Sequence, residues 1–71
     1  MNRTSVSSSN LASVGYDPNS QTLEIEFLHG GIYQYSNVPL SVYEGLMAAS
    51  SHGSYFDQNV KKAGYSYRKI S

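Results

Sequence analysis

The chain has 71 residues, no cysteine, and five basic side chains balanced by five acidic ones. This length predicts one domain, which buries only about 60% of the surface that its unfolded chain exposes. Without cysteine there is no disulfide framework or thiolate zinc site, and the two histidines lack further metal ligands, so we expect no metal and no cofactor. The balanced charge argues against a protein that coats long nucleic acid through an overall positive field.

The N-terminus carries no targeting or anchoring signal. No apolar run approaches the roughly 20 residues of a membrane span, and the first residues lack the apolar core of a signal peptide. We therefore expect a cytoplasmic protein with no membrane partner. Residues 1–10 contain four serines and one small apolar residue, Val6. Residues 1–8 are predicted to be flexible unless Val6 adds to a strand edge, and residues 9–69 should form the single domain.

Strand patterns dominate the first half of the chain. Residues 11–16 alternate loosely and end at a turn over residues 17–20, which are rich in turn-forming side chains. Residues 22–27 alternate strictly between apolar and polar side chains, and residues 32–36 follow after two glycines. The pattern predicts a three-stranded antiparallel meander in which residues 22–27 form the central strand.

The connection between the second and third predicted strands decides where Tyr33 and Tyr35 point. A two-residue turn at His29-Gly30 would place both rings on the acidic face of residues 22–27. A three-residue loop ending in Gly30 would place both on the apolar face. We favour the longer loop, because burying each ring stabilises a small domain by about 1.5–3 kcal/mol.

Helical patterns follow the strands. Apolar residues recur at helical spacing after Pro39, which predicts an amphipathic helix that covers the sheet. Residues 50–53 break this pattern, and Ser54 is predicted to cap a second helix from Tyr55 to Lys62 that ends at Gly64. The sequence therefore predicts an α+β fold in which the meander is followed by two helices packed on the sheet.

No arrangement of residues predicts catalysis. No serine stands in a strained nucleophile elbow, and His29 lies in an expected turn. Glu24 and Glu26 alternate on one face of a strand, which is the ordinary outcome of an amphipathic pattern. We expect no catalytic residues and no enzyme.

Aromatic and basic residues gather near the C-terminus, where they could stack on bases and contact phosphates. The candidate ligand-binding residues are Lys61, Lys62, Tyr65, Tyr67, Arg68 and Lys69. The pattern slightly favours another explanation, in which the tyrosines fix the tail to the domain and the cations keep it soluble. Tyr33 and Tyr35 are the remaining stacking candidates, and for them too a structural role is favoured.

A candidate anion site lies at the start of the second predicted helix. Backbone N–H groups of Gly53, Ser54 and Tyr55 could hold a phosphate there, because the helix dipole favours an anion at this end. Most helices begin in this way without a ligand, so the signal is weak.

Short motifs follow one another in a characteristic order: Ser8-Ser9-Asn10-Leu11, Val14-Gly15-Tyr16-Asp17, Leu23-Glu24-Ile25-Glu26-Phe27, Gly30 with Tyr33-Gln34-Tyr35, Val38-Pro39 with Val42-Tyr43 and Leu46, and Ser51-His52-Gly53-Ser54-Tyr55-Phe56. Together they resemble the KTSC domain, from about Val6 to Arg68. This family is named after the C-terminal segment of some lysyl-tRNA synthetases and also occurs as stand-alone bacterial and phage proteins. Its hallmark is the central Y-x-Y.

The resemblance implies a domain whose suggested role is RNA binding, because the family occurs attached to a tRNA-charging enzyme. This chain departs from the family at residues 57–62, where the family usually has an asparagine and an Ile-Arg pair. Asp57 adds a negative charge beside the candidate anion site and argues against phosphate there. The balanced charge favours a short strand or a single nucleotide over long nucleic acid.

Three hypotheses follow for the function. The first is a small non-enzymatic binding module for RNA or a nucleotide. The second is a stand-alone phage or prophage protein that sequesters a small nucleotide signal, which predicts a pocket and not a groove. The third is an adaptor that contacts a protein partner, or copies of itself in a homo-oligomer, through the outer face of the sheet.

Overall fold

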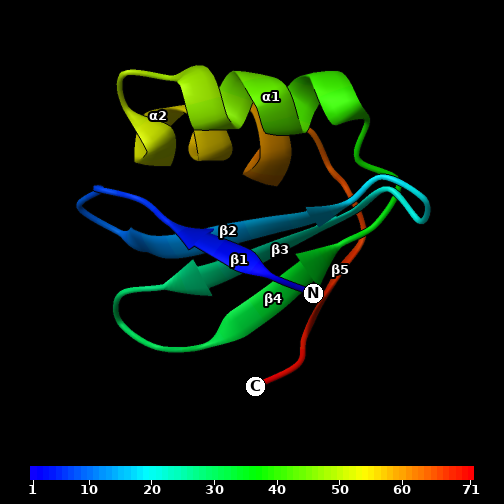
Figure 1. Cartoon of the computed structure of the whole chain (residues 1–71), viewed down its shortest axis with the longest axis horizontal. Helices are drawn as coiled ribbons and strands as arrows, with labels where there is room; N and C mark the ends of the chain where they lie inside the picture. Colours follow the sequence, from blue (N-terminus) through cyan, green and yellow to red (C-terminus); the bar gives the residue numbers. More distant parts are fainter.

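The computed structural model describes residues 1–71 and contains one sheet with all helical segments on one of its faces (Figure 1). The five antiparallel strands stand in the order of the sequence: β1 (Arg3–Ser5), β2 (Leu11–Asp17), β3 (Thr22–Phe27), β4 (Ile32–Tyr35) and β5 (Tyr67–Lys69). Between β4 and β5 the chain forms α1 (Leu40–Ala48), α2 (His52–Phe56) and the π-helix η1 (Asp57–Lys61). No helix is long and apolar enough to cross a membrane.

The α+β class is confirmed, whereas the prediction of a three-stranded meander is wrong. Two edge strands, β1 and β5, pair with β2 and β4 and extend the sheet to five strands. Each is three residues long and exposed throughout, so neither carries the apolar alternation that marks a half-buried strand. Their pairing satisfies backbone groups that the meander would leave open at its edges. Residues 3–5 lie within the segment predicted to be flexible, and the structure places them in β1.

The connection between β3 and β4 confirms the favoured register. Gly30 donates its N–H to the Phe27 carbonyl at 3.0 Å, and the Phe27 N–H donates to the Gly31 carbonyl at 3.1 Å, which closes the longer loop. Gly30 has a φ of 107°, which residues with a side chain rarely adopt. Tyr33 and Tyr35 consequently stand opposite apolar residues of β3, on the face covered by the helices.

The second helical segment differs from its prediction. Ser51, not Ser54, caps it, because the Ser51 hydroxyl accepts the Ser54 N–H at 3.3 Å. The predicted cap therefore lies inside α2. From Asp57 onward the chain widens into η1, in which the Lys62 N–H donates to the Asp57 carbonyl at 3.1 Å. Such π-turns are rare in proteins, and many of those known lie at functional sites.

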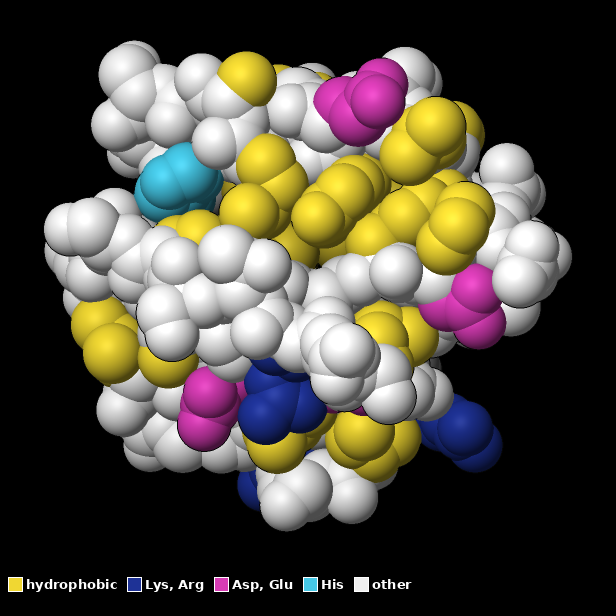
Figure 2. All heavy atoms as spheres, in the orientation of Figure 1, with side chains coloured by type: hydrophobic (Ala, Val, Ile, Leu, Met, Phe, Trp, Pro, Cys, Tyr) yellow, Lys and Arg dark blue, Asp and Glu magenta, His cyan; other side chains and the backbone are white.

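The hydrophobic core fills the space between the sheet and the helical segments. Its buried side chains come from three strands, the β4–α1 connection and all three helical segments: Leu11, Val14, Leu23, Ile25, Tyr35, Val38, Leu46, Phe56 and Val60. Along one edge of this core, apolar side chains form a surface band between α1 and the sheet (Figure 2). Tyr16 of β2 stacks on Tyr43 of α1, with ring centroids 4.8 Å apart, and donates its hydroxyl to the Val38 carbonyl.

The uncovered face of the sheet carries one row of directly paired residues that spans all five strands: Arg3, Gly15, Glu24, Gln34 and Arg68. Arg3 forms an ion pair with Glu24 at 2.5 Å, and the Gln34 amide donates to the other Glu24 oxygen at 2.9 Å. Arg68 donates to the Gln34 oxygen at 3.4 Å. We call these five residues the polar row.

Gly15 allows the polar row to form. A Cβ at this position would lie 2.8 Å from the Asn2 carbonyl oxygen and 3.0 Å from Cγ of Arg3. A side chain there would therefore push β1 away from β2. Because Gly15 has none, Arg3 crosses over β2 and reaches Glu24 on β3.

Glu24 is a carboxylate with 4% of its surface exposed. Burial alone would raise its pKa, but hydrogen bonds from Gln34 and Arg3, together with the positive charge of Arg3, outweigh burial and lower it. The native state thus favours the ionised form of this side chain.

Glu24→Gln is expected to lower the free energy of unfolding at pH 7 by about 1.5–3 kcal/mol, because hydrogen bonds to a charged group are lost. Urea denaturation measures this change. Because the pKa of Glu24 is lower in the native than in the unfolded state, its stabilisation is complete above the unfolded pKa, about 4.3. It is lost as the pH falls through the lower native pKa.

Glu26→Gln is the control at the next position on this face. The Glu26 side chain is 40% exposed, lies 4.0 Å from Arg3 and accepts a hydrogen bond from the Ser13 hydroxyl at 2.8 Å. As the pH falls below about 4.3, Glu24→Gln is expected to lose less stability than the wild type, and Glu26→Gln should retain the contribution of Glu24. If Glu24→Gln showed the same pH dependence of stability as the wild type, the lowered pKa of Glu24 in the native state would be contradicted.

Candidate ligand-binding site

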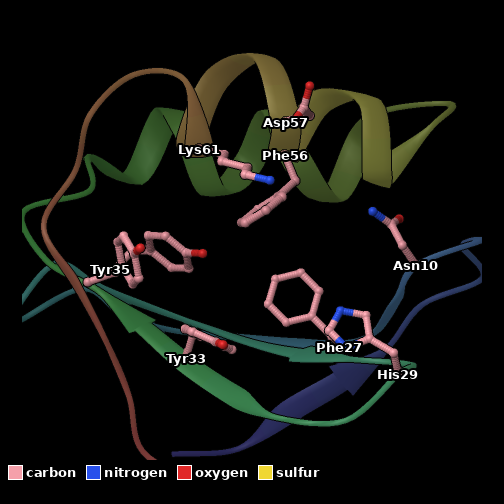
Figure 3. A pocket seen from close by; sticks show the side chains of 9 residues that line it. Asn10, Phe27, His29, Tyr33, Tyr35, Phe56, Asp57 and Lys61 are labelled. Atoms are coloured by element: carbon pink, nitrogen blue, oxygen red, sulfur yellow. The ribbon is translucent and has the colours of Figure 1, made fainter.

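A cavity of about 410 Å³ lies between η1 and the covered face of the sheet near β4 and β5 (Figure 3). Five aromatic residues form most of its wall: Phe27, Tyr33, Tyr35, Phe56 and Tyr67. The polar residues on its border are Asn10, His29, Asp57 and Lys61. We refer to this space as the aromatic cavity.

The alternation of β4 and its pairing with β5 bring the tyrosines together. Tyr33 and Tyr35 are two residues apart and therefore share one face, and Tyr67 of β5 stands directly opposite Tyr35. The ring centroids of Tyr35 and Tyr67 are 5.3 Å apart. Tyr35 is only 6% exposed whereas Tyr67 is 64% exposed, so the cavity runs from a buried ring to an accessible one.

Edge-to-face contacts hold the deep wall of the aromatic cavity. Phe27 contacts Tyr33 with centroids 5.5 Å apart and rings nearly perpendicular, at 84°. Phe56 contacts Phe27 at 5.5 Å and Tyr35 at 5.4 Å in similar geometry. Such pairs contribute about 0.5–1.5 kcal/mol each beyond the burial of their area. The wall is therefore held in place by the core.

The tyrosine hydroxyls of the aromatic cavity are available to a ligand. Burial first, and then the neighbouring Tyr67 and Tyr33, raise the pKa of Tyr35 to about 12. Tyr35 is therefore neutral at physiological pH and can both donate and accept. The Tyr16 hydroxyl, which lies outside the cavity, is the only tyrosine hydroxyl that forms a hydrogen bond within the protein. No buried side-chain polar atom lacks a hydrogen-bond partner.

Two residues border the cavity near the β3–β4 loop. His29 stacks on Phe27 with centroids 5.4 Å apart and an interplanar angle of 13°, which extends the aromatic wall outward. Asn10 accepts the Leu28 N–H on its carbonyl at 2.9 Å. Its side chain lies against Gly53, where a Cβ would be 3.1 Å from Cγ of Asn10.

Lys61 is the cation of the aromatic cavity. It ends η1, and Figure 3 shows its amino group directed toward the space between the rings. Asp57, one π-helical turn earlier, directs its carboxylate away from that space and pairs with Lys62 at 3.4 Å. No carboxylate lies within ion-pair distance of Lys61.

The predicted ligand-binding residues separate in the structure. Tyr33, Tyr35, Lys61 and Tyr67 line the aromatic cavity. Lys69 does not line it but stands directly opposite Tyr33 and shares its face of the sheet. Lys62 is paired with Asp57, Arg68 belongs to the polar row on the other face, and Tyr65 is half-buried against the core.

The candidate anion residues Gly53, Ser54 and Tyr55 lie in the first turn of α2 and do not line the aromatic cavity. The Ser54 N–H donates to the Ser51 hydroxyl, and the Tyr55 N–H donates to the Ser51 carbonyl at 3.1 Å. Two of the three backbone donors are therefore used by the helix itself. No three His, Cys, Asp or Glu side chains are grouped so that they could hold a metal ion.

Sequence reasoning missed Phe27, Phe56, His29 and Asn10 as cavity residues. Phe27 and Phe56 have the spacing of core residues. Phe56 is buried in the core, Phe27 packs against it, and both also line the cavity. The available signal was that Phe27, Tyr33 and Tyr35 share a face in the favoured register. The positions of His29 and Asn10 depend on loop geometry, for which the sequence carries no comparable pattern.

These features define a class of protein: a small α+β domain whose antiparallel sheet is covered on one face and encloses an aromatic cavity at one end. A family model described as the KTSC domain matches residues 7–65. The chain belongs to the KTSC domain family. A KTSC domain protein from Yersinia pestis, known from a crystal structure, is 44% identical, with a TM-score of 0.91 over 99% of this chain and 97% of that chain.

Relatives differ in how much of their length this domain makes up. An uncharacterized protein from Stutzerimonas stutzeri is 44% identical over 70 residues, which cover 99% of both chains. A lysine–tRNA ligase from a Nostoc species is 45% identical over 56 residues, which are 79% of this chain but 10% of the ligase. The similarity to that ligase therefore concerns one small part of it.

The two ends of the cavity should differ in their contribution to stability. Tyr35→Ala is expected to lower the free energy of unfolding by about 3–5 kcal/mol, as for other large buried aromatic residues. Tyr67→Ala should change it by less than about 1 kcal/mol, since the ring is mostly exposed. Chemical denaturation compares the two. Tyr35→Phe is the control and should stay within about 1 kcal/mol of the wild type, and a larger loss would reveal a hydrogen bond to its hydroxyl.

Proposed function

We propose that this domain binds a single nucleobase in the aromatic cavity, presented either by RNA or by a free nucleotide. The observation that carries the proposal is the cavity itself, a space of about 410 Å³ walled by five aromatic rings and faced by Lys61. Its volume lies in the range of about 300–1,000 Å³ that is typical of small-molecule sites.

The rings supply what a base requires. Tyr67 is exposed and offers a face for stacking, while Phe56 and Tyr35 close the inner end of the cavity. Stacking of one base on an aromatic ring contributes about 1–3 kcal/mol. The free hydroxyls of Tyr33 and Tyr35 add donors and acceptors for the polar edge of a base.

The charge at the cavity selects among aromatic ligands. Aromatic cages also hold quaternary ammonium groups, but a lysine amino group directed into such a cage repels a cation. Lys61 instead favours a flat ligand that carries negative charge. A nucleotide combines both properties.

The second candidate function is sequestration of a small nucleotide, as expected for a stand-alone phage or prophage protein. A cavity for one base, rather than a groove along the sheet, favours this function over binding of an extended strand. We propose binding without turnover, because His29 is stacked on Phe27 and Asp57 is paired with Lys62, which leaves no base beside a nucleophile.

An NMR titration of the labelled protein with mononucleotides, dinucleotides and short RNAs at low salt tests the proposal. Shifts are expected to cluster on Tyr33, Tyr35, Phe56 and Tyr67. Tyr67→Ala should weaken binding about 5-fold to 150-fold, which corresponds to the loss of about 1–3 kcal/mol of stacking.

Tyr43→Leu is the matched control, since Tyr43 stacks on Tyr16 outside the cavity. Its affinity should equal that of the wild type. A spectrum that stays unchanged with every nucleotide and RNA would overturn the proposal and favour a protein adaptor or a homo-oligomer.

A further inference from the structure

The basic residues near the C-terminus separate into two pairs with different surroundings. Lys61 and Lys69 have no carboxylate within ion-pair distance, and Lys61 lines the aromatic cavity. Lys62 is paired with Asp57 at 3.4 Å, and Arg68 donates to Gln34 on the opposite face of the sheet. The sequence presents these four cations as one group, but the fold directs only two of them to the ligand side.

The separation follows from local geometry. Successive residues of a strand point to opposite faces, so Lys69 shares the covered face with Tyr67 and Tyr33 while Arg68 does not. Successive residues of a helical turn likewise point in different directions, so Lys61 and Lys62 diverge. One lysine from η1 and one from β5 therefore flank the same aromatic wall.

Tyr33 is related to each of the two free lysines in a different way. It lines the cavity together with Lys61, and it is the direct partner of Lys69 across the β4–β5 ladder. Lys69 also borders Gly31, at which a Cβ would lie 3.5 Å from Cε of Lys69. The carboxylate that borders the cavity, Asp57, is directed outward and neutralised by Lys62. Lys61 and Lys69 therefore have no carboxylate partner within ion-pair distance.

We infer that the ligand is a nucleoside phosphate whose base occupies the aromatic cavity and whose one or two phosphates lie between Lys61 and Lys69. This inference rests on the proposed function and narrows it. Two free cations match the negative charge of the phosphates in a mononucleotide or dinucleotide. Lys62 and Arg68 are not placed to contact the further phosphates of a longer strand. Phosphate therefore supplies most of the affinity beyond stacking.

Titration of the full chain with nucleosides and with the corresponding 5′-monophosphates tests the inference, with isothermal calorimetry as the readout at low salt. The monophosphate is expected to bind about tenfold or more tightly than its nucleoside. Lys61→Gln and Lys69→Gln should each bring the ratio of monophosphate affinity to nucleoside affinity close to one. Their sequence neighbours give matched controls, Lys62→Gln and Arg68→Gln, which should behave as the wild type.

Different results would overturn the phosphate subsite and the base-binding function. Equal binding of nucleoside and monophosphate would overturn the phosphate subsite and leave the base-binding cavity standing. A similar loss of monophosphate affinity in all four variants would also overturn it, because the loss would then come from overall charge and not from a defined phosphate contact. Tight binding of a short RNA that depends on Lys62 and Arg68 would replace it with a strand-binding surface. Absence of binding by nucleosides, monophosphates and RNA would overturn the proposed function itself.

Discussion

The ion pair between Arg3 and Glu24 is the contact that ties the N-terminal edge strand to the middle of the sheet. It joins an edge strand to the central strand across β2, and Gly15 makes that crossing sterically feasible. A carboxylate that is 4% exposed needs partners, since burying an unpaired charge costs several kcal/mol. Arg3 and Gln34 meet this need from both sides. The polar row therefore keeps one face of the sheet hydrophilic, while the other face supplies the core and the aromatic cavity.

Much of this fold could be predicted because its main patterns are local. The alternation of residues 22–27 and the glycine loop after them specify the meander and place Tyr33 and Tyr35 on the covered face. The edge strands β1 and β5 could not be predicted in this way. Their residues are exposed throughout, so their pairing depends on the open edges of a sheet that is already formed. The π-turn of η1 likewise reflects tertiary packing, because its widening goes with the burial of Phe56 and Val60.

The candidate site was only partly predictable for the same reason. Sequence reasoning identified Tyr33, Tyr35, Lys61 and Tyr67, which the structure brings together around one cavity. It also grouped Lys62 and Arg68 with them, because neighbours in sequence look equivalent until the direction of each side chain is known. It did not identify Phe27 and Phe56, whose spacing is that of core residues. In a domain of this size, one ring can belong to the core on one side and to a binding cavity on the other.

The aromatic cavity takes one wall from an edge strand, and this has a thermodynamic consequence. β5 is three residues long and is held to the sheet from one side, through its pairing with β4. Local opening of such a segment costs less free energy than global unfolding. A ligand that touches Tyr67 binds only while the strand is docked, so its binding and the docking equilibrium are linked by mass action. If the proposed ligand binds against Tyr67, the docked population of the C-terminal strand therefore rises with ligand concentration.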